Sequence, residues 1–261
     1  MINVIDQLDR KIQLQAPAQR IVSIVPSQTE LLFHLGLDKE VVGITRFCIH
    51  PKEWHATKKR IGGTKTVNID AVKELQPDLI IANKEENTKQ QIEELEKIAP
   101  VWISDINKLD GSFDMIREVG ILTGKVPEAE AIAQEIINAF NGLEPSAVPF
   151  RVCYFIWRNP YMTVGRDTFI SNLLSKCGFI NVFQNDKRYP EVNIEKIIEA
   201  RPGIIFLSSE PYPFKEKHIE EIKLYMPEIQ VVLVDGEMFS WYGSRLLKSP
   251  DYFKKLISEI K

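Results

Sequence analysis

Two segments of the chain resemble each other closely enough to constrain the fold. The segment Val67–Pro77 (VNIDAVKELQP) is followed 125 residues later by Val192–Pro202 (VNIEKIIEARP). Over the 20 positions that start at each valine, seven residues are identical, and both copies continue into an apolar run and a loop with an acid, Glu85 or Glu210. Solenoid repeats have periods of about 20–50 residues, so this offset favours a duplicated domain. The chain is predicted to contain two similar lobes of roughly 100 residues each.

Short runs rich in valine and isoleucine alternate along the chain with amphipathic segments. The predicted strands are Ile21–Val25, Val41–Ile44, Leu79–Ala82, Val101–Ser104, Val152–Trp157, Ile204–Leu207 and Val231–Val234. The predicted helices are Gln28–Leu35, Ile69–Leu75, Thr88–Ile98, Thr168–Lys176, Ile194–Glu199, His218–Leu224 and Tyr252–Ile260. Strands that alternate with helices are typical of an α/β fold with a mostly parallel sheet.

The region between the two halves predicts helices rather than strands. Gly124 can end one helix and Pro127 can begin the next. From Pro127 to Gly142 the apolar residues form one stripe, over a length of about 24 Å. We interpret this segment as a helix that joins the lobes, with a surface helix of one lobe as the alternative. The segment 144–149 predicts a linker, which gives an N-terminal lobe at 1–110, connecting helices and linker at 111–148, and a C-terminal lobe at 149–261.

Composition and charge exclude several classes of protein. The net charge is −3 and the charges are mixed, with no basic tract beyond Lys58–Arg60, which argues against a nucleic-acid binder. No stretch reaches the ~18 apolar residues of a membrane span. Three cysteines, Cys48, Cys153 and Cys177, cannot form a complete set of disulfides and are expected to be small buried or half-buried side chains.

Signatures of catalysis are absent from the sequence. It contains no G-x-S-x-G, H-E-x-x-H, P-loop or G-x-G-x-x-G pattern. His50 and His55 are five residues apart, which does not place them on one helix face; a metal site that they form with a carboxylate is the alternative to structural or surface histidines. We therefore expect no enzyme, no metal site and no resident cofactor.

Ser27-Gln-Thr-Glu30 follows a predicted strand and has the pattern of a capping box. Ser27 is expected to cap the helix, with Glu30 reaching back to the first amide. Because a helix start that faces a ligand site can also bind anionic or polar groups, a ligand role for Ser27 is the alternative.

Asp70 and Glu195 occupy the same position in the two repeats, in the first turn of a predicted helix. Such acids stabilise a helix by about 0.3–1 kcal/mol through its dipole. The alternative is a matched pair, one acid per lobe, that docks on basic residues of a partner. The sequence does not decide between the two.

Aromatic and small polar residues gather in the loops that follow predicted strands, where α/β proteins bind ligands. They are Phe47, Trp54, Thr64, Trp157, Tyr161, Tyr189, Tyr212, Phe239, Trp241 and Tyr242. Several loop aromatics suit a large, flat, partly apolar ligand.

Several motifs together resemble a known family, the class III substrate-binding proteins of ABC importers for vitamin B12, haem and iron–siderophores. The first-lobe motifs are RIVSIVPSQTE (20–30), VGIT (42–45), RIGG (60–63), NID (68–70) and PDLI (77–80). The second-lobe motifs are TVGRDTFI (163–170), GFINVF (178–183) and YPEVN (189–193). The resemblance spans nearly the whole chain and is strongest to cobalamin-binding members.

The resemblance implies a fold, a ligand and a partner. The fold would be two Rossmann-like α/β lobes joined by a long backbone helix, with a ligand cleft between the lobes. The ligand would be cobalamin or a similar metal chelate; the alternatives are a ferric-siderophore or haem receptor of the same fold, or a cytoplasmic corrinoid-handling protein. The residues expected at the ligand are Ser27, Phe47, Thr64, Asn83, Trp157, Tyr189 and Trp241, of which Thr64 and Asn83 fall where a close cobalamin binder can carry tryptophans.

The resemblance also implies a place of action. Asp70 and Glu195 match the paired acids that meet arginines of an ABC permease dimer, so the protein would be peripheral to the membrane, in the periplasm or on the cell surface. Residues 1–20 lack the basic-then-apolar pattern of a signal peptide, which keeps a cytoplasmic location as the alternative.

Overall fold

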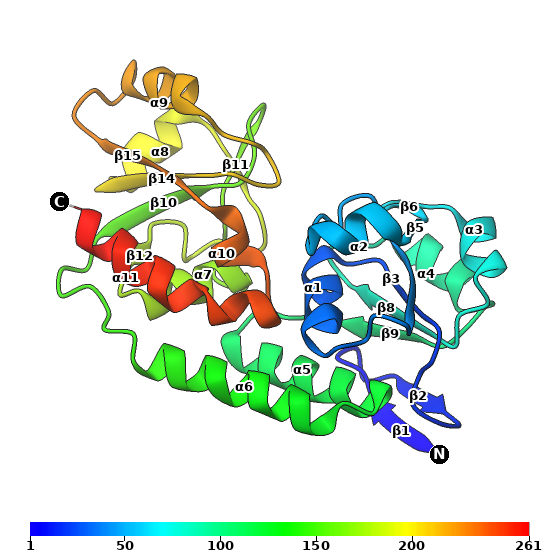
Figure 1. Ribbon diagram of the computed structural model, residues 1–261. Helices are drawn as coiled ribbons and strands as arrows, with labels where there is room; N and C mark the ends of the chain where they lie inside the picture. Colours follow the sequence, from blue (N-terminus) through cyan, green and yellow to red (C-terminus); the bar gives the residue numbers. More distant parts are fainter. Residues whose placement is uncertain (261) are drawn as a thin grey trace. The chain divides into compact units, whose positions relative to one another are not determined.

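The computed structural model describes residues 1–260, which divide into two compact units (Figure 1). Unit 1 consists of Met1–Ile106, Asp110–Asn138 and Tyr242–Leu247. Unit 2 consists of Asn107–Leu109, Ala139–Trp241 and the residues from Lys248 onward. Each unit has a parallel sheet with helices, so the predicted fold class of two α/β lobes is confirmed.

The main sheet of unit 1 has five parallel strands in the order β5-β4-β3-β8-β9. The strands are β3 (Ile21–Ser23), β4 (Val41–Ile44), β5 (Lys59–Arg60), β8 (Leu79–Asn83) and β9 (Val101–Ser104). The central strands β3 and β8 are buried along their whole length, which explains their continuous apolar sequence. Strand β3 lies between β4 and β8. The chain therefore adds β4 and β5 on one side of β3 and later adds β8 and β9 on its other side.

The remaining elements of unit 1 are helices and two small hairpins. The helices are α1 (Pro26–His34), α2 (Lys52–Thr57), α3 (Ile69–Glu74), α4 (Lys89–Leu95), α5 (Leu109–Thr123), α6 (Val126–Asn141) and the short 3₁₀ helix η1 (Ser244–Leu247). The hairpins pair β1 (Ile2–Ile5) with β2 (Lys11–Leu14) and β6 (Gly62–Gly63) with β7 (Thr66–Val67). The N-terminal hairpin was not predicted, because its alternation of apolar and polar residues is short.

The N-terminal hairpin protects the edge of the main sheet through one buried carboxylate. Asp6 accepts hydrogen bonds from the Leu8 and Arg10 amides, which shape the turn, and from the Ile103 amide of edge strand β9. The Gln7 amide donates to the Ile103 carbonyl at 3.2 Å. These bonds occupy backbone groups that an exposed edge strand would leave open to another chain.

Unit 2 repeats this plan with four parallel strands in the order β12-β10-β14-β15. The strands are β10 (Arg151–Phe155), β12 (Ile180–Asn181), β14 (Ile204–Ser208) and β15 (Gln230–Val234), with a separate hairpin of β11 (Tyr161–Met162) and β13 (Glu191–Val192). The helices are α7 (Phe169–Lys176), α8 (Ile194–Ala200), α9 (Glu216–Lys223), α10 (Gly236–Ser240) and α11 (Ser249–Glu259). As in unit 1, the first strand is flanked by the second on one side and the third on the other.

The sequence repeat corresponds to the same local structure in both units. Asn68 caps α3 by accepting from the Ala71 amide at 3.0 Å, and Asn193 caps α8 by accepting from the Lys196 amide at 3.0 Å. Each helix is followed by a residue with φ of 46°, Gln76 or Arg201, before the proline that leads into the next strand. The predicted duplication therefore extends to the helix caps and to a left-handed turn residue.

The predicted helix from Pro127 to Gly142 is observed as α6, one residue earlier at each end. Its residues up to Asn138 belong to unit 1 and its last residues to unit 2, so α6 carries the chain from one unit to the other. Within unit 1 it packs on α5, beside which it lies in Figure 1. A Cβ atom at Gly120 of α5 would come within 2.4 Å of the Ala129 side chain, so glycine is what permits this close approach.

Two further expectations have definite outcomes. All three cysteines are free and buried, as predicted. The capping box at α1 is wrong: the helix begins at Pro26, its N-cap residue is Val25, and no side chain caps it. Proline suits the first helical position, which moves Ser27 inside the helix. No helix among residues 1–260 is long and apolar enough to cross a membrane.

Glu30 instead forms a buried ion pair with Arg245, whose Nε donates to Glu30 Oε2 at 2.8 Å. Both side chains are only 6% exposed. Arg245 lies in η1, which packs on α1 within unit 1. A short segment from near the C-terminus is thus fixed onto the first helix of unit 1.

Changing Arg245 to Ala is expected to lower the free energy of unfolding by about 3–5 kcal/mol, because it leaves the Glu30 carboxylate buried without its partner. Urea denaturation followed by circular dichroism measures the change. The double variant Glu30→Leu with Arg245→Met removes both charges and should be clearly more stable than Arg245→Ala. An unchanged unfolding midpoint for Arg245→Ala would contradict this role of the ion pair.

Candidate functional site

Each unit has a candidate ligand-binding surface at the carboxyl edge of its main sheet. Parallel strands bring all their carboxyl ends to one edge, and ligands of open α/β sheets bind where the strand order reverses. That point lies between β3 and β8 in unit 1 and between β10 and β14 in unit 2. The residues that follow these strands are therefore the first to consider.

In unit 1 a chain of buried polar side chains lines this edge. Gln28 Nε2 donates to Ser104 Oγ at 2.5 Å, and Asn83 Nδ2 donates to the same oxygen at 2.9 Å. The Asn83 Oδ1 atom accepts from the Glu85 amide, and Asn87 Nδ2 donates to the Thr64 carbonyl at 2.8 Å. Asn83 is buried and its amide group is used within the unit, so it shapes the surface from beneath.

Ser27 differs from Asn83 because its hydroxyl is buried without a hydrogen-bond partner among the described residues. Gln28 Oε1 is in the same condition. Buried polar atoms in native proteins nearly always find a partner in protein, water or ligand. In the first turn of α1, Ser27 Oγ can donate or accept a hydrogen bond and Gln28 Oε1 can accept one, so both atoms can bond to a polar group that comes to this edge.

The loop after β4 presents Phe47, which is 49% exposed. Its backbone is fixed from below: the Phe47 amide donates to Thr45 Oγ1, and the hydroxyls of Thr45 and Thr29 contact the buried Cys48 thiol at 3.2 and 3.1 Å. Burial raises the pKa of Cys48 to about 11, so the thiol stays protonated and inert. The exposed aromatic ring of Phe47 thus lies on a loop whose backbone is fixed by buried contacts.

In unit 2 the loop after β10 presents Trp157, which is 40% exposed. The ring of Tyr212, from the loop after β14, meets Trp157 edge-to-face at 5.8 Å between centroids. The neighbouring Arg158 forms an ion pair with Glu221 at 2.7 Å, and the Tyr161 hydroxyl donates to the same carboxylate. These contacts fix the aromatic pair where the order of the sheet reverses.

Tyr189 lies at the start of the β13 hairpin and is half-buried. The guanidinium of Arg188 lies 5.6 Å from the centre of its ring. Arg188 has φ of 57°, and its amide donates to Asp167 Oδ1 at 2.5 Å. The loop that carries the Tyr189 ring is therefore fixed by the hydrogen bond from the Arg188 amide to Asp167.

Trp241 ends α10 and is largely buried, so it offers little surface. The preceding Ser240 donates its hydroxyl to the Glu210 carboxylate at 2.5 Å. Burial raises the pKa of Glu210 to about 7. The nearby carboxylates of Glu237 and Asp235 also raise this pKa, whereas the hydrogen bond from Ser240 lowers it. Glu210 is the acid of the second repeat, and here it ties the loop after β14 to α10.

Some of the aromatics that the sequence singled out are part of the core. Trp54 and Phe239 are fully buried, and Trp54 donates its indole N–H to Asp38 at 2.7 Å. Tyr242 is buried and belongs to unit 1. Among residues 1–260 no group of three or more histidine, cysteine, aspartate or glutamate side chains could hold a metal ion.

Asp70 and Glu195 are both exposed, each in the first turn of a helix with an asparagine cap. The cap already satisfies the amide at the third helical position, so neither carboxylate is needed for capping. Both carboxylates are therefore exposed at equivalent positions of the two repeats.

Sequence reasoning did not single out two arginines that lie against the predicted ligand residues. The Arg46 guanidinium lies 4.9 Å from the centre of the Phe47 ring, and the Arg188 guanidinium lies 5.6 Å from the centre of the Tyr189 ring. The available signal was that each arginine directly precedes its aromatic residue.

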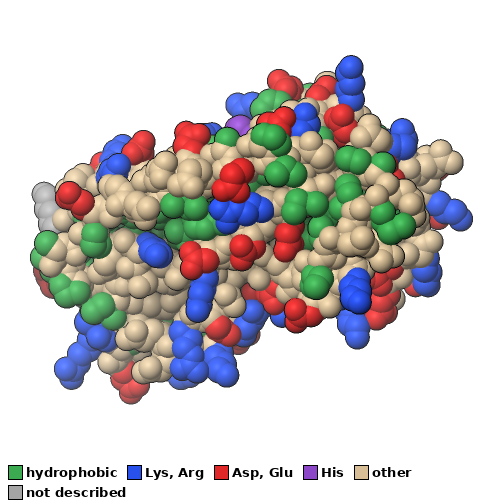
Figure 2. Space-filling model, turned by 90° about the horizontal axis from the view of Figure 1, so that it is seen from below, with side chains coloured by type: hydrophobic (Ala, Val, Ile, Leu, Met, Phe, Trp, Pro, Cys, Tyr) green, Lys and Arg blue, Asp and Glu red, His purple; other side chains and the backbone are tan. Residues whose placement is uncertain are grey.

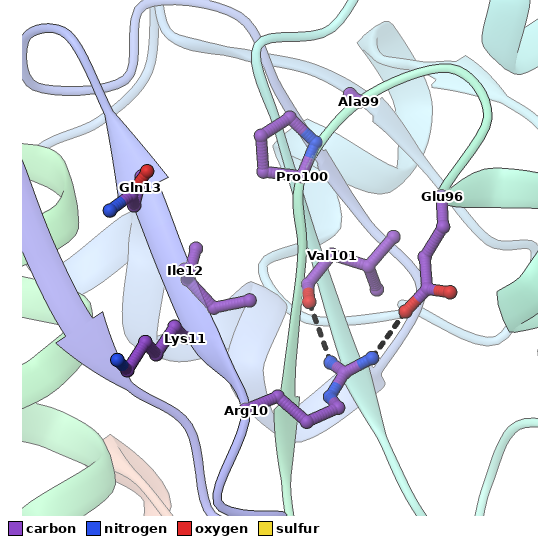
Figure 3. A pocket seen from close by; sticks show the side chains of 8 residues that line it. All are labelled: Arg10, Lys11, Ile12, Gln13, Glu96, Ala99, Pro100 and Val101. Atoms are coloured by element: carbon purple, nitrogen blue, oxygen red, sulfur yellow. Dashed lines mark hydrogen bonds and ion pairs between the residues drawn. The ribbon is translucent and has the colours of Figure 1, made fainter.

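A shallow hollow of about 470 Å³ lies elsewhere, beside the amino end of β9 (Figure 3). Arg10 reaches across it from the N-terminal hairpin to the Val101 carbonyl at 2.7 Å and to Glu96. Since this hollow is at the opposite end of β9 from Ser104, we do not assign the ligand to it. On the face shown in Figure 2, acidic and basic side chains are interspersed.

Proteins of known function that are similar in sequence bind vitamin B12. A vitamin B12-binding protein of Vibrio cholerae is 27% identical over 197 residues, which cover 74% of this chain and 71% of that protein. The vitamin B12-binding protein of Pectobacterium atrosepticum is 23% identical over 256 residues, covering 93% of this chain and 90% of that protein.

Solved structures share the fold. The periplasmic vitamin B12-binding protein BtuF of Vibrio cholerae matches with a TM-score of 0.73 and 22% identity, covering 94% of this chain and 99% of that one. The petrobactin-binding protein YclQ of Bacillus subtilis matches with a TM-score of 0.79 and 19% identity, covering 99% and 96%. Residues 21–229 match the sequence profile of periplasmic binding proteins, and the chain belongs to that family.

Proposed function

We propose that this protein is the solute-binding component of an ABC importer and that it binds cobalamin or a related metal chelate. It acts outside the cytoplasmic membrane and passes its ligand, chemically unchanged, to a permease. Each unit offers a candidate surface for the ligand at the carboxyl edge of its main sheet.

One observation carries this proposal. In a chain of this family, each unit presents an exposed aromatic ring at the carboxyl edge of its sheet, Phe47 in unit 1 and Trp157 in unit 2. Exposed aromatic side chains on rigid bases suit a large, flat ligand, since they contribute area without losing much conformational freedom on binding. The similarity to vitamin B12-binding proteins supports a corrinoid as that ligand.

A ferric-siderophore or haem receptor is the second candidate. Structures of a petrobactin-binding protein and of haem-binding proteins share the fold. Thr64, which is only partly buried, stands at a position where a larger aromatic wall was expected for cobalamin. A smaller or differently shaped chelate would fit such a surface.

Isothermal titration calorimetry with cyanocobalamin, haemin and a ferric siderophore tests the proposal. At least one of the three is expected to bind with a dissociation constant in the micromolar range or below. Absence of binding by all three, with the protein folded, would contradict it.

Changing Trp157 to Ala is expected to weaken binding of the identified ligand by at least about 1 kcal/mol, which is about fivefold, because the ring loses its stacking contact. Phe47→Ala should act in the same direction. Tyr225→Ala is the control, since Tyr225 is 57% exposed but follows the C-terminal end of α9, away from the carboxyl edge. Equal affinities for Trp157→Ala and Tyr225→Ala would remove Trp157 from the site.

The double change of Asp70 and Glu195 to Ala is expected to leave ligand affinity intact and to reduce ligand-dependent transport by a reconstituted permease. Complementary charge steers and orients such an encounter. The matched control changes Glu53 and Glu216 to Ala, which removes one exposed first-turn acid from each unit at another helix. Transport that is equally reduced, or equally unaffected, in both double variants would contradict specific docking through Asp70 and Glu195.

A further inference from the structure

We infer that His218 is a positioning residue for the ligand surface of unit 2. In its neutral form the His218 ring holds Tyr212 and, through it, the exposed Trp157, whereas protonation of the ring releases both. Ligand affinity is therefore regulated by pH. This last step rests on the proposed function, because it takes Trp157 to contact the ligand; all the groups involved lie in unit 2.

The hydrogen bonds of His218 fix which ring nitrogen carries the proton. His218 is 3% exposed, and the Lys215 amide donates to its Nδ1 atom at 2.8 Å. Because an amide N–H can only donate, Nδ1 accepts this bond and carries no hydrogen. The proton of the neutral ring therefore lies on Nε2, which is 3.3 Å from the Tyr212 hydroxyl oxygen and donates to it.

His218 occupies the position that a glutamate or glutamine has in a capping box. Lys215 is the N-cap residue of α9, and His218 is the third residue of that helix. In a capping box the side chain at this third position accepts from the N-cap amide. An imidazole makes the same bond and has a second nitrogen, which here reaches Tyr212.

Tyr212 links His218 to the exposed tryptophan. Its ring lies edge-to-face with the His218 ring at 5.5 Å and with the Trp157 ring at 5.8 Å between centroids. Phe214 packs against both Tyr212 and His218, at 4.8 and 5.4 Å. The Tyr212 amide donates to the Ile156 carbonyl at 3.3 Å, which joins the loop after β14 to the loop after β10. A displacement of Tyr212 therefore reaches Trp157 directly.

The charges around His218 oppose a second proton on its ring. Burial lowers the pKa of His218, and the cations of Lys217 and Arg158 lower it further. Glu221 acts in the opposite direction, but its carboxylate already pairs with Arg158 and accepts from the Tyr161 hydroxyl. The ring is therefore neutral at neutral pH.

A second proton removes the bond that fixes the ring. Both nitrogens of an imidazolium are donors, so Nδ1 can no longer accept from the Lys215 amide and two donors face each other. The start of α9 and the Tyr212 side chain then lose a contact that holds them. The Trp157 ring, with a neighbour that is no longer fixed, must be ordered when a ligand binds, which costs affinity. Since the pKa of His218 is lowered, affinity is full at neutral and alkaline pH and falls as the pH drops through the pKa of the folded protein.

Nuclear magnetic resonance of the ligand-free protein tests the positioning. The nitrogen shifts of the His218 ring, assigned by their loss in His218→Gln, should place the proton of the neutral ring on Nε2. As the pH is lowered from about 8 to about 4.5, the Trp157 indole resonance, assigned with Trp157→Phe, should shift with the same midpoint as the His218 ring. In His218→Gln the side chain can still accept from the Lys215 amide but does not titrate, so the Trp157 resonance should not follow that midpoint.

Calorimetric titration with cyanocobalamin, haemin and a ferric siderophore tests the effect on binding. The affinity for a probe that binds should fall about fivefold across the His218 midpoint, as expected when one aromatic side chain must be ordered on binding. His218→Leu removes both hydrogen bonds and should have the lower affinity already at about pH 8. His218→Gln should restore part of that affinity and remove the fall in acid. The effect of pH on the probe itself is common to all the proteins and cancels in this comparison.

His34→Gln is the matched control, because His34 is the exposed last residue of α1 in unit 1. This variant should keep both the affinity and its pH profile. A proton on Nδ1 of the neutral His218 ring, a Trp157 resonance that stays constant through the His218 titration, or a fall in affinity that His218→Gln retains would overturn the inference while the proposed function stands. Failure of all three probes to bind at every pH would overturn the proposed function, and the Trp157 resonance would then still decide whether His218 positions the pair.

Discussion

The site depends on one constraint of backbone geometry, the parallel pairing of strands. In a parallel sheet every strand ends at the same edge, so the loops that follow β3, β4 and β8 gather there in unit 1, as the loops after β10 and β14 do in unit 2. Strands β8 and β14 are buried and are apolar except at their last residues, Asn83 and Ser208, so most of each strand serves only as scaffold. Sequence variation in the loops can therefore change the ligand without changing the scaffold.

The two units hold their candidate ligand-binding residues by different means. In unit 1 the support is a network of neutral side chains, in which Ser104 receives hydrogen bonds from Gln28 and Asn83. In unit 2 the support is aromatic and ionic: Tyr212 packs on Trp157, and Glu221 holds Arg158. Both arrangements restrict the side chains before a ligand arrives, which lowers the entropic cost of binding.

Much of the fold was predictable because its signals are local. Strands β4 and β9 have the predicted bounds, since each is an apolar run with clear limits, and the asparagine caps follow from the repeat. The site was less accessible, because burial depends on contacts between distant segments. Trp54 and Phe47 look alike in the sequence, yet one is in the core and the other is exposed.

Other features of the site depended on tertiary partners that no sequence pattern reveals. Ser27 and Glu30 have the spacing of a capping box, but the helix begins at Pro26 and the Glu30 carboxylate forms an ion pair with Arg245. The sequence places Arg46 directly before Phe47, but this order alone does not show that the guanidinium lies over the ring.

The place of η1 in unit 1 has a consequence for how the protein is made. Glu30 must wait for a partner 215 residues further along the chain. At about 5–20 residues per second, a ribosome needs on the order of ten to forty seconds to supply it. During that interval α1 lacks both the counter-charge of Arg245 and the contact with η1, so this part of unit 1 is completed only after most of the chain has been synthesised. Although its sheet is complete by residue 104, unit 1 matures only when translation is nearly over, at almost the same time as unit 2.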